Sequence, residues 1–135
     1  MNDPVDRDAL PQLQAVHAVT LTPESVTAVA TLATSLGLET VRVDLAGCED
    51  KAGLLERIAA ALALPSWFGA NWDALYDCLL DLSWRPGQGW VLILENAHDL
   101  RRAAPDALDT ALAIMNDAAT AWQARGVPLR VLVAA

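Results

Sequence analysis

Three aspartates in one short stretch are the first residues whose types and spacing suggest chemistry. Asp73, Asp77 and Asp81 lie four residues apart within LPSWFGANWDALYDCLLDLSW, residues 64–84. That spacing places all three side chains on one face of an α-helix, which we name the acidic face. Like charges so spaced destabilise a helix by about 0.2–0.5 kcal/mol per pair. Because folding alone does not explain the acidic face, we expect it to meet a partner; the alternative is a face that is only solvated.

Two carboxylates in proximity also permit hydrolysis, with or without a divalent metal ion. Asp73 and Asp77 would then form the catalytic pair. The sequence carries no nucleophile elbow and no phosphate loop beside them. Its two histidines, His17 and His98, have no histidine or cysteine at metal-ligand spacing. We therefore predict a protein that is not an enzyme and that needs no cofactor and no metal, and we keep a carboxylate-dependent hydrolase as the weaker alternative.

The composition favours a protein partner over a nucleic acid. The chain has 135 residues, 54% of them hydrophobic, and a formal net charge of −8. This length and hydrophobicity fit one folded domain. Nucleic acids and anionic membranes both require a basic surface, so neither is expected as a direct partner. A basic protein fits an acidic surface, because opposite charges accelerate association. Many proteins are acidic merely for solubility, so the charge alone is weak evidence.

The expected compartment is the cytoplasm. The chain opens with the polar stretch MNDPVDRDALPQ, which has none of the features of a secretory signal. The apolar runs are too short to span a bilayer. Cys48 and Cys78 form no CxxC motif, and two cysteines are too few for a disulfide scaffold. We expect both to be reduced thiols.

Strand patterns alternate with helix patterns along the chain, which predicts an α/β fold with a mostly parallel sheet and right-handed crossovers, in two or three layers. The predicted strands are 15–21, 40–45, 90–94 and 129–133, and the predicted helices are 23–36, 51–64, 72–82, 97–103 and 105–126.

Residues typical of helix ends set the predicted boundaries of these helices. Thr22, Asp50 and Asn71 are suited to N-cap positions, and Gly37 to the end of the first helix. Pro65 is expected to end the second helix. The stripe opposite the acidic face has the spacing of a buried surface; it consists of Trp72, Leu75, Tyr76 and Leu79. The last helix has a similar core face, made of Leu108, Leu112, Met115, Ala119 and Trp122.

The run LPSWFGANWDALYDCL, residues 64–79, resembles the signature of the barstar family. The shared pattern is Leu-Pro, two aromatics, Gly-x-Asn-x-Asp-Ala-Leu, an aromatic and Asp-Cys-Leu. The resemblance extends over residues 40–135 and implies a small parallel sheet flanked by helices. The first 39 residues lie outside it. We expect residues 1–12 to be a loose tail and residues 13–39 to add a βα unit to one single domain.

The resemblance implies an intracellular inhibitor of a microbial ribonuclease of the barnase type. In this family the acidic helix and the loop before it cover the active site of a basic, extracellular-type nuclease. Asp77 matches the central acid that mimics phosphate, and Asp73 matches the second acidic contact. Asn71 matches the asparagine at the helix start, Trp67 replaces a tyrosine that stacks on the nuclease, and Gly69 lies in the same loop. A monomer that forms a 1:1 heterodimer is the simplest expectation. Trp67 has the alternative of capping the core.

Some positions depart from the family pattern. A further acid late in the last helix falls on Ala121 when Gly126 is aligned. Asp81 and Leu82 replace a glycine-tryptophan pair, and Asp81 is a candidate substitute for the missing acid. A second hypothesis follows from these changes: a protein-interaction domain that keeps the fold but binds another basic protein.

Overall fold

The computed structural model describes residues 13, 17–65, 68–83 and 87–134. Within them, four parallel strands form one sheet in the order β1-β4-β3-β2. The strands are β1 (Val19–Leu21), β2 (Glu39–Asp44), β3 (Trp90–Glu95) and β4 (Leu129–Ala134). The helices are α2 (Ser25–Ser35), α3 (Lys51–Leu62), α4 (Trp72–Asp81), α5 (His98–Ala103) and α6 (Pro105–Ala124). The predicted α/β class with a small parallel sheet is confirmed.

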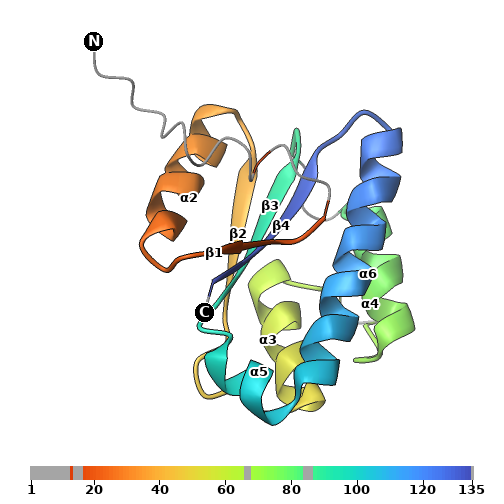
Figure 1. Ribbon diagram of the computed structural model, residues 1–135. Helices are drawn as coiled ribbons and strands as arrows, with labels where there is room; N and C mark the ends of the chain where they lie inside the picture. Colours follow the sequence, from red (N-terminus) through yellow and green to blue (C-terminus); the bar gives the residue numbers. More distant parts are fainter. Residues whose placement is uncertain (1–12, 14–16, 66–67, 84–86, 135) are drawn as a thin grey trace.

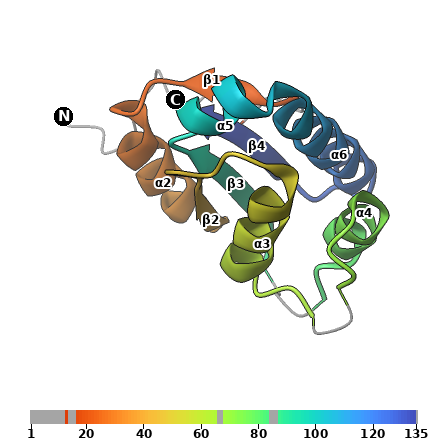
Figure 2. The same ribbon diagram turned by 90° about the horizontal axis from the view of Figure 1, so that it is seen from below.

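The molecule has three layers, with helices on both faces of the sheet (Figures 1 and 2). The helix α2 covers one face, and α3, α4 and α6 lie on the other. The short helix α5 follows the carboxyl end of β3. The predicted N-terminal βα unit is present as β1 and α2. It adds a strand at the β4 edge, where Val19 pairs with Leu132.

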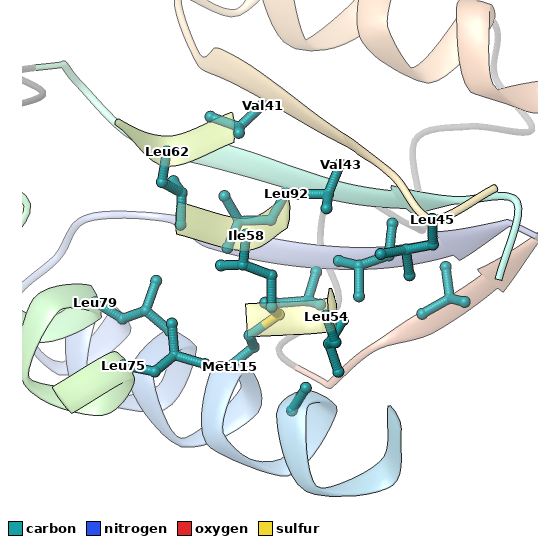
Figure 3. Close-up of a cluster of buried hydrophobic side chains, with 14 of the residues drawn as sticks. Val41, Val43, Leu45, Leu54, Ile58, Leu62, Leu75, Leu79, Leu92 and Met115 are labelled. Atoms are coloured by element: carbon teal, nitrogen blue, oxygen red, sulfur yellow. The ribbon is translucent and has the colours of Figure 1, made fainter. Parts of the chain in front are cut away.

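The core is divided by the sheet into two clusters. Alternate residues of β3 enter different clusters, so Leu92 and Leu94 face α3 and α6 while Val91 and Ile93 face α2. A strand covered on both faces must be apolar at every position, which explains the uninterrupted run WVLIL. Figure 3 shows the larger cluster, in which side chains of α3, α4 and α6 converge on one face of the sheet.

Most predicted helix ends are confirmed. The Asp50 side chain accepts a hydrogen bond from the Gly53 N–H at 2.7 Å, as an N-cap does. Gly37 follows α2 with a φ of +76°, and the Leu38 N–H returns to the Ala33 carbonyl. This bond is typical of a helix that ends at glycine.

The first predicted strand, 15–21, begins only at Val19 among the described residues, and two predicted helix boundaries are wrong. Thr22 does not cap α2, which begins at Ser25. The Ser25 N–H bonds to the Thr22 carbonyl only three residues back, so Thr22 belongs to a tight turn before the helix. The helix α3 ends at Leu62 rather than at Pro65, because Ala63 adopts a left-handed conformation with a φ of 52°.

None of the helices in the described part of the chain has the length and hydrophobicity needed to cross a membrane.

Candidate protein-binding face

The helix α4 buries one side and exposes the other. Leu75, Cys78 and Leu79 are fully buried, and Figure 3 shows Leu75 and Leu79 within the larger core cluster. All three aspartates of the acidic face are exposed to solvent. The periodicity in the sequence therefore located the exposed side of this helix.

The buried stripe is rotated slightly from the one predicted. Trp72 and Tyr76 are only half-buried and pack at the margin of the core. Cys78 and Leu82, which the predicted stripe did not include, are almost completely buried. The smaller side chains therefore take the central positions of the buried side.

Asn71 connects the acidic helix to the loop before it. Its side-chain oxygen accepts a hydrogen bond from the Ala74 N–H at 2.8 Å, and its side-chain amide donates to the Gly69 carbonyl at 3.4 Å. A Cβ atom on Gly69 would lie 3.1 Å from the Asn71 amide nitrogen. The loop and the start of the helix are thus held together by one side chain, and Gly69 leaves room for it.

Trp67 lies outside the described residues, so its predicted contact stays a prediction. The neighbouring Phe68 is half-buried and packs against the core. The Phe68 N–H donates to the Pro65 carbonyl at 2.9 Å, which forms a turn ahead of α4.

The aspartates of the acidic face have no cationic partner within the described part of the chain. At the start of α4, the Lys51 Nζ lies 5.1 Å from the centre of the Trp72 ring. Asp73 occupies the first turn of the helix, where the helix dipole favours a negative charge. The Asp81 carboxylate lies at the opposite end, where the dipole disfavours it.

The buried thiol of Cys78 lies beneath this charged surface. Burial raises the pKa of Cys78, and the charges of Asp77 and Asp81 raise it further. Both causes favour the neutral thiol. Cys48 is likewise buried, and neither cysteine forms a disulfide in the structure.

The far end of α4 is fastened to α6 by two side chains. The Trp122 indole Nε1 donates to the Leu79 carbonyl at 2.7 Å, and the Arg125 Nη1 donates to the Leu80 carbonyl at 2.9 Å. The Arg125 guanidinium also lies 4.5 Å from the centre of the Trp122 ring. Sequence reasoning assigned Trp122 to the core and did not consider Arg125. The available signal was a polar-tipped aromatic followed by a cation at the end of a long helix.

Comparison with known proteins identifies the chain's relatives. A family model described as "Barstar (barnase inhibitor)" matches residues 38–134. The chain belongs to the barstar family. No curated protein matches the chain at the level of individual sequences.

The barstar match contains the acidic helix and three of the four strands. It begins just before β2, so β1 and α2 precede the part that the family shares. Ala121 is half-buried on α6, one residue before Trp122. The members of the family are described as inhibitors.

The alternative of metal-assisted chemistry has its own structural requirement, a cluster of ligands. Among the described residues, no three histidine, cysteine, aspartate or glutamate side chains lie close enough together to hold a metal ion. His17 and His98 are both exposed and lie on different elements from the acidic face.

Proposed function

We propose that this barstar-family protein binds a basic ribonuclease of the barnase type and blocks its active site in the cytoplasm. The observation that carries the proposal is the acidic face: three exposed carboxylates without a cationic partner among the described residues, on a helix inside the barnase-inhibitor match. An isolated helix does not favour such a face, and a cationic active site would neutralise it.

The chemistry of a ribonuclease suits this arrangement. Such an enzyme holds the phosphate of its substrate with arginine, lysine and histidine side chains. A carboxylate in the phosphate position accepts charge-assisted hydrogen bonds from the same groups, and arginine can donate two of them in parallel. Inhibition then needs no turnover, only a carboxylate held where the phosphate would lie.

Each candidate residue has a distinct role in this complex. Asp77 occupies the phosphate position, and Asp73 makes the second acidic contact. Trp67 stacks on the nuclease, while Asn71 and Gly69 shape the loop that carries it. Asp81 extends the acidic face to the carboxyl end of α4. Because Leu75 and Leu79 anchor the opposite side of α4 in the core, little ordering of the backbone is required when the partner binds.

The decisive experiment is titration calorimetry against a catalytically inactive barnase-type ribonuclease. We expect nanomolar or tighter binding in a 1:1 ratio, and weaker binding as salt is added. Asp77→Ala should weaken binding about a hundredfold or more, equivalent to about 2.7 kcal/mol, because a desolvated charge pair loses one partner.

The matched control is Asp109→Ala. Asp109 is also an exposed aspartate, but it lies in the first turns of α6, at the opposite end from the residues that contact α4. This variant removes the same charge and should bind within about threefold of wild type. Equal losses for Asp77→Ala and Asp109→Ala would show that only net charge matters and would refute the site.

The second candidate function is an interaction domain for a basic protein other than a ribonuclease. The βα unit outside the family match and the alanine at position 121 favour it. Absence of binding to any barnase-type ribonuclease, together with capture of one basic protein by wild type but not by Asp77→Ala, would replace the first proposal with this one.

A further inference from the structure

The carboxyl end of α4 is completed by side chains of another helix. The last four carbonyls of any α-helix lack N–H partners within that helix. At the end of α4 the Leu82 N–H donates a hydrogen bond to the Cys78 carbonyl at 3.1 Å. The next two carbonyls accept hydrogen bonds from side chains: the Leu79 carbonyl from the Trp122 indole, and the Leu80 carbonyl from the Arg125 guanidinium. Trp122 of α6 and Arg125, which directly follows α6, thus supply donors that a further turn of α4 would have supplied.

These donors are themselves held in place. The Trp122 ring packs edge-on against Trp90, with the ring centres 4.9 Å apart, and Trp90 is buried at the start of the central strand β3. The Arg125 guanidinium lies over the Trp122 ring, 4.5 Å from its centre. The acidic helix is therefore connected to the sheet through a chain of contacts that runs from Leu79 through Trp122 to Trp90.

The hydrogen bonds to α4 define its orientation more narrowly than its hydrophobic contacts do. Leu75 and Leu79 hold the helix against the core, but apolar packing tolerates small slides and rotations. A hydrogen bond weakens steeply once its donor leaves the line of the acceptor. A helix of ten residues has little stability of its own to resist such movements. Because Trp122 and Arg125 bond the carboxyl end of α4 from outside that helix, they restrict its rotation about its own axis.

We propose that Trp122 and Arg125 are positioning residues for the acidic face: they set the direction in which Asp73, Asp77 and Asp81 point before a partner arrives. This inference rests on the proposed function, since it concerns how tightly the same face binds. Binding sites need their contact groups held by a supporting layer of packed and hydrogen-bonded residues. Removal of that layer should therefore loosen the complex although no contact residue changes.

The test uses Trp122→Phe, which keeps an aromatic ring and removes the indole N–H. We expect the dissociation rate from the inactive ribonuclease to rise about tenfold, the size of effect that the loss of one neutral hydrogen bond produces. Arg125→Met should raise the dissociation rate in the same way. Its association rate should also increase, because a positive charge beside the acidic face has been removed.

The control for a merely structural effect is Val29→Ala. Val29 is fully buried in the core cluster under α2, on the opposite side of the sheet from α4. This variant loses global stability without touching the acidic helix. Measured at a temperature where all variants are folded, it should dissociate at the wild-type rate. A dissociation rate for Trp122→Phe equal to that of Val29→Ala would overturn the inference.

Hydrogen exchange distinguishes failure of the inference from failure of the proposed function. In Trp122→Phe, peptides that cover α4 should exchange several times faster than in Val29→Ala, relative to peptides from β3 in each protein. If wild type binds no barnase-type ribonuclease, the proposed function is wrong, but faster exchange confined to α4 still supports the positioning role. If exchange in α4 is the same in both variants, that role is refuted whatever the partner.

Discussion

Two groups of acidic side chains in this protein have opposite surroundings. The aspartates of the acidic face project from α4 and have no donor on their carboxylates within the described residues. A second group, which we name the sheet-end acids, consists of Asp44, Glu95 and Asp99 and lies where β2 and β3 end. Each sheet-end acid accepts hydrogen bonds from groups distant in sequence.

The donors to the sheet-end acids come from strand β2 and from the segments that follow β2 and β3. Asp44 accepts from the Asn96 side chain at 2.8 Å, and Asp99 accepts from the Gly47 N–H at 3.2 Å. These two bonds link the loop after β2 with the segment after β3. Glu95 accepts two hydrogen bonds of 2.6 Å from Arg42 on the neighbouring strand. The sheet-end acids thus stabilise the pairing of β2 with β3 and the contact between the segments that follow these strands.

The presence or absence of hydrogen-bond donors distinguishes acids that stabilise the fold from acids that are available to a partner. A carboxylate that already has donors would have to release them before it could bind anything else. A carboxylate that has only water can exchange water for a partner's cations. Both groups contribute equally to the net charge, so charge counting alone cannot tell them apart; their hydrogen bonds do.

The largest effect on stability should follow from Glu95→Ala. The Glu95 side chain is 18% exposed and the Arg42 side chain 49% exposed, so solvent weakens the pair, but its geometry is bidentate. We expect a loss of about 1 kcal/mol in the free energy of unfolding, measured by urea denaturation. Asp77→Ala, measured in parallel, should change that free energy by less than about 0.5 kcal/mol.

When affinity is measured instead of stability, the larger loss should occur in Asp77→Ala and not in Glu95→Ala. Glu95→Ala should retain wild-type affinity for the inactive ribonuclease, whereas Asp77→Ala should not. A loss of affinity in Glu95→Ala with the fold intact would contradict the division between the two groups.

A smaller effect should appear in the pH dependence of stability. The hydrogen bonds from Asn96 and from the Ala46 N–H hold the pKa of Asp44 below its ordinary value. A carboxyl whose pKa is lower in the folded state stabilises the fold above its unfolded pKa of about 3.9. That stabilisation is lost as the pH falls through the lowered folded value. The fold should therefore lose part of its stability as the pH falls below about 4.

Asp44→Asn provides the comparison, because asparagine does not titrate and can still accept a hydrogen bond. Its free energy of unfolding should fall below that of wild type at pH 7 and approach it as the pH is lowered past 4. The free energy of unfolding of both proteins is measured by urea denaturation at each pH. If their difference is constant across the whole range, Asp44 contributes through its shape and not through its charge.

Much of the fold follows from periodicity in the sequence. The run at 90–94 is apolar at every position because β3 is covered on both faces, and each of the four predicted strands exists in the sheet. The caps at Asp50 and Asn71 were predictable because their side chains bond within the next few residues. The prediction that Thr22 caps α2 was wrong because a turn from Thr22 to Ser25 forms first and the helix begins only at Ser25.

The supporting contacts of the acidic face could not be predicted, because they join residues more than forty positions apart. Trp122 has the spacing of a core residue, and spacing does not show that its indole reaches the Leu79 carbonyl. Arg125 follows the last helical residue and looks like a solvated cation. The exposure of Asp73 and Asp77 followed from helical geometry, whereas their proposed roles came from the resemblance to barstars.

The smallest expected effect compares two aspartates of the acidic face itself. Asp81 is the last residue of α4, where the helix dipole disfavours its charge, and it lies four residues from Asp77. Asp81→Asn should therefore raise the free energy of unfolding by about 0.5 kcal/mol at low salt. For Asp73 the dipole acts in the opposite direction, so relief of repulsion and loss of the dipole interaction oppose each other, and Asp73→Asn should be neutral or slightly destabilising. In high salt both differences should shrink toward zero. If both variants were equally stabilised, mutual repulsion alone would govern the acidic face, and position along α4 would have no influence on the energy of its charges.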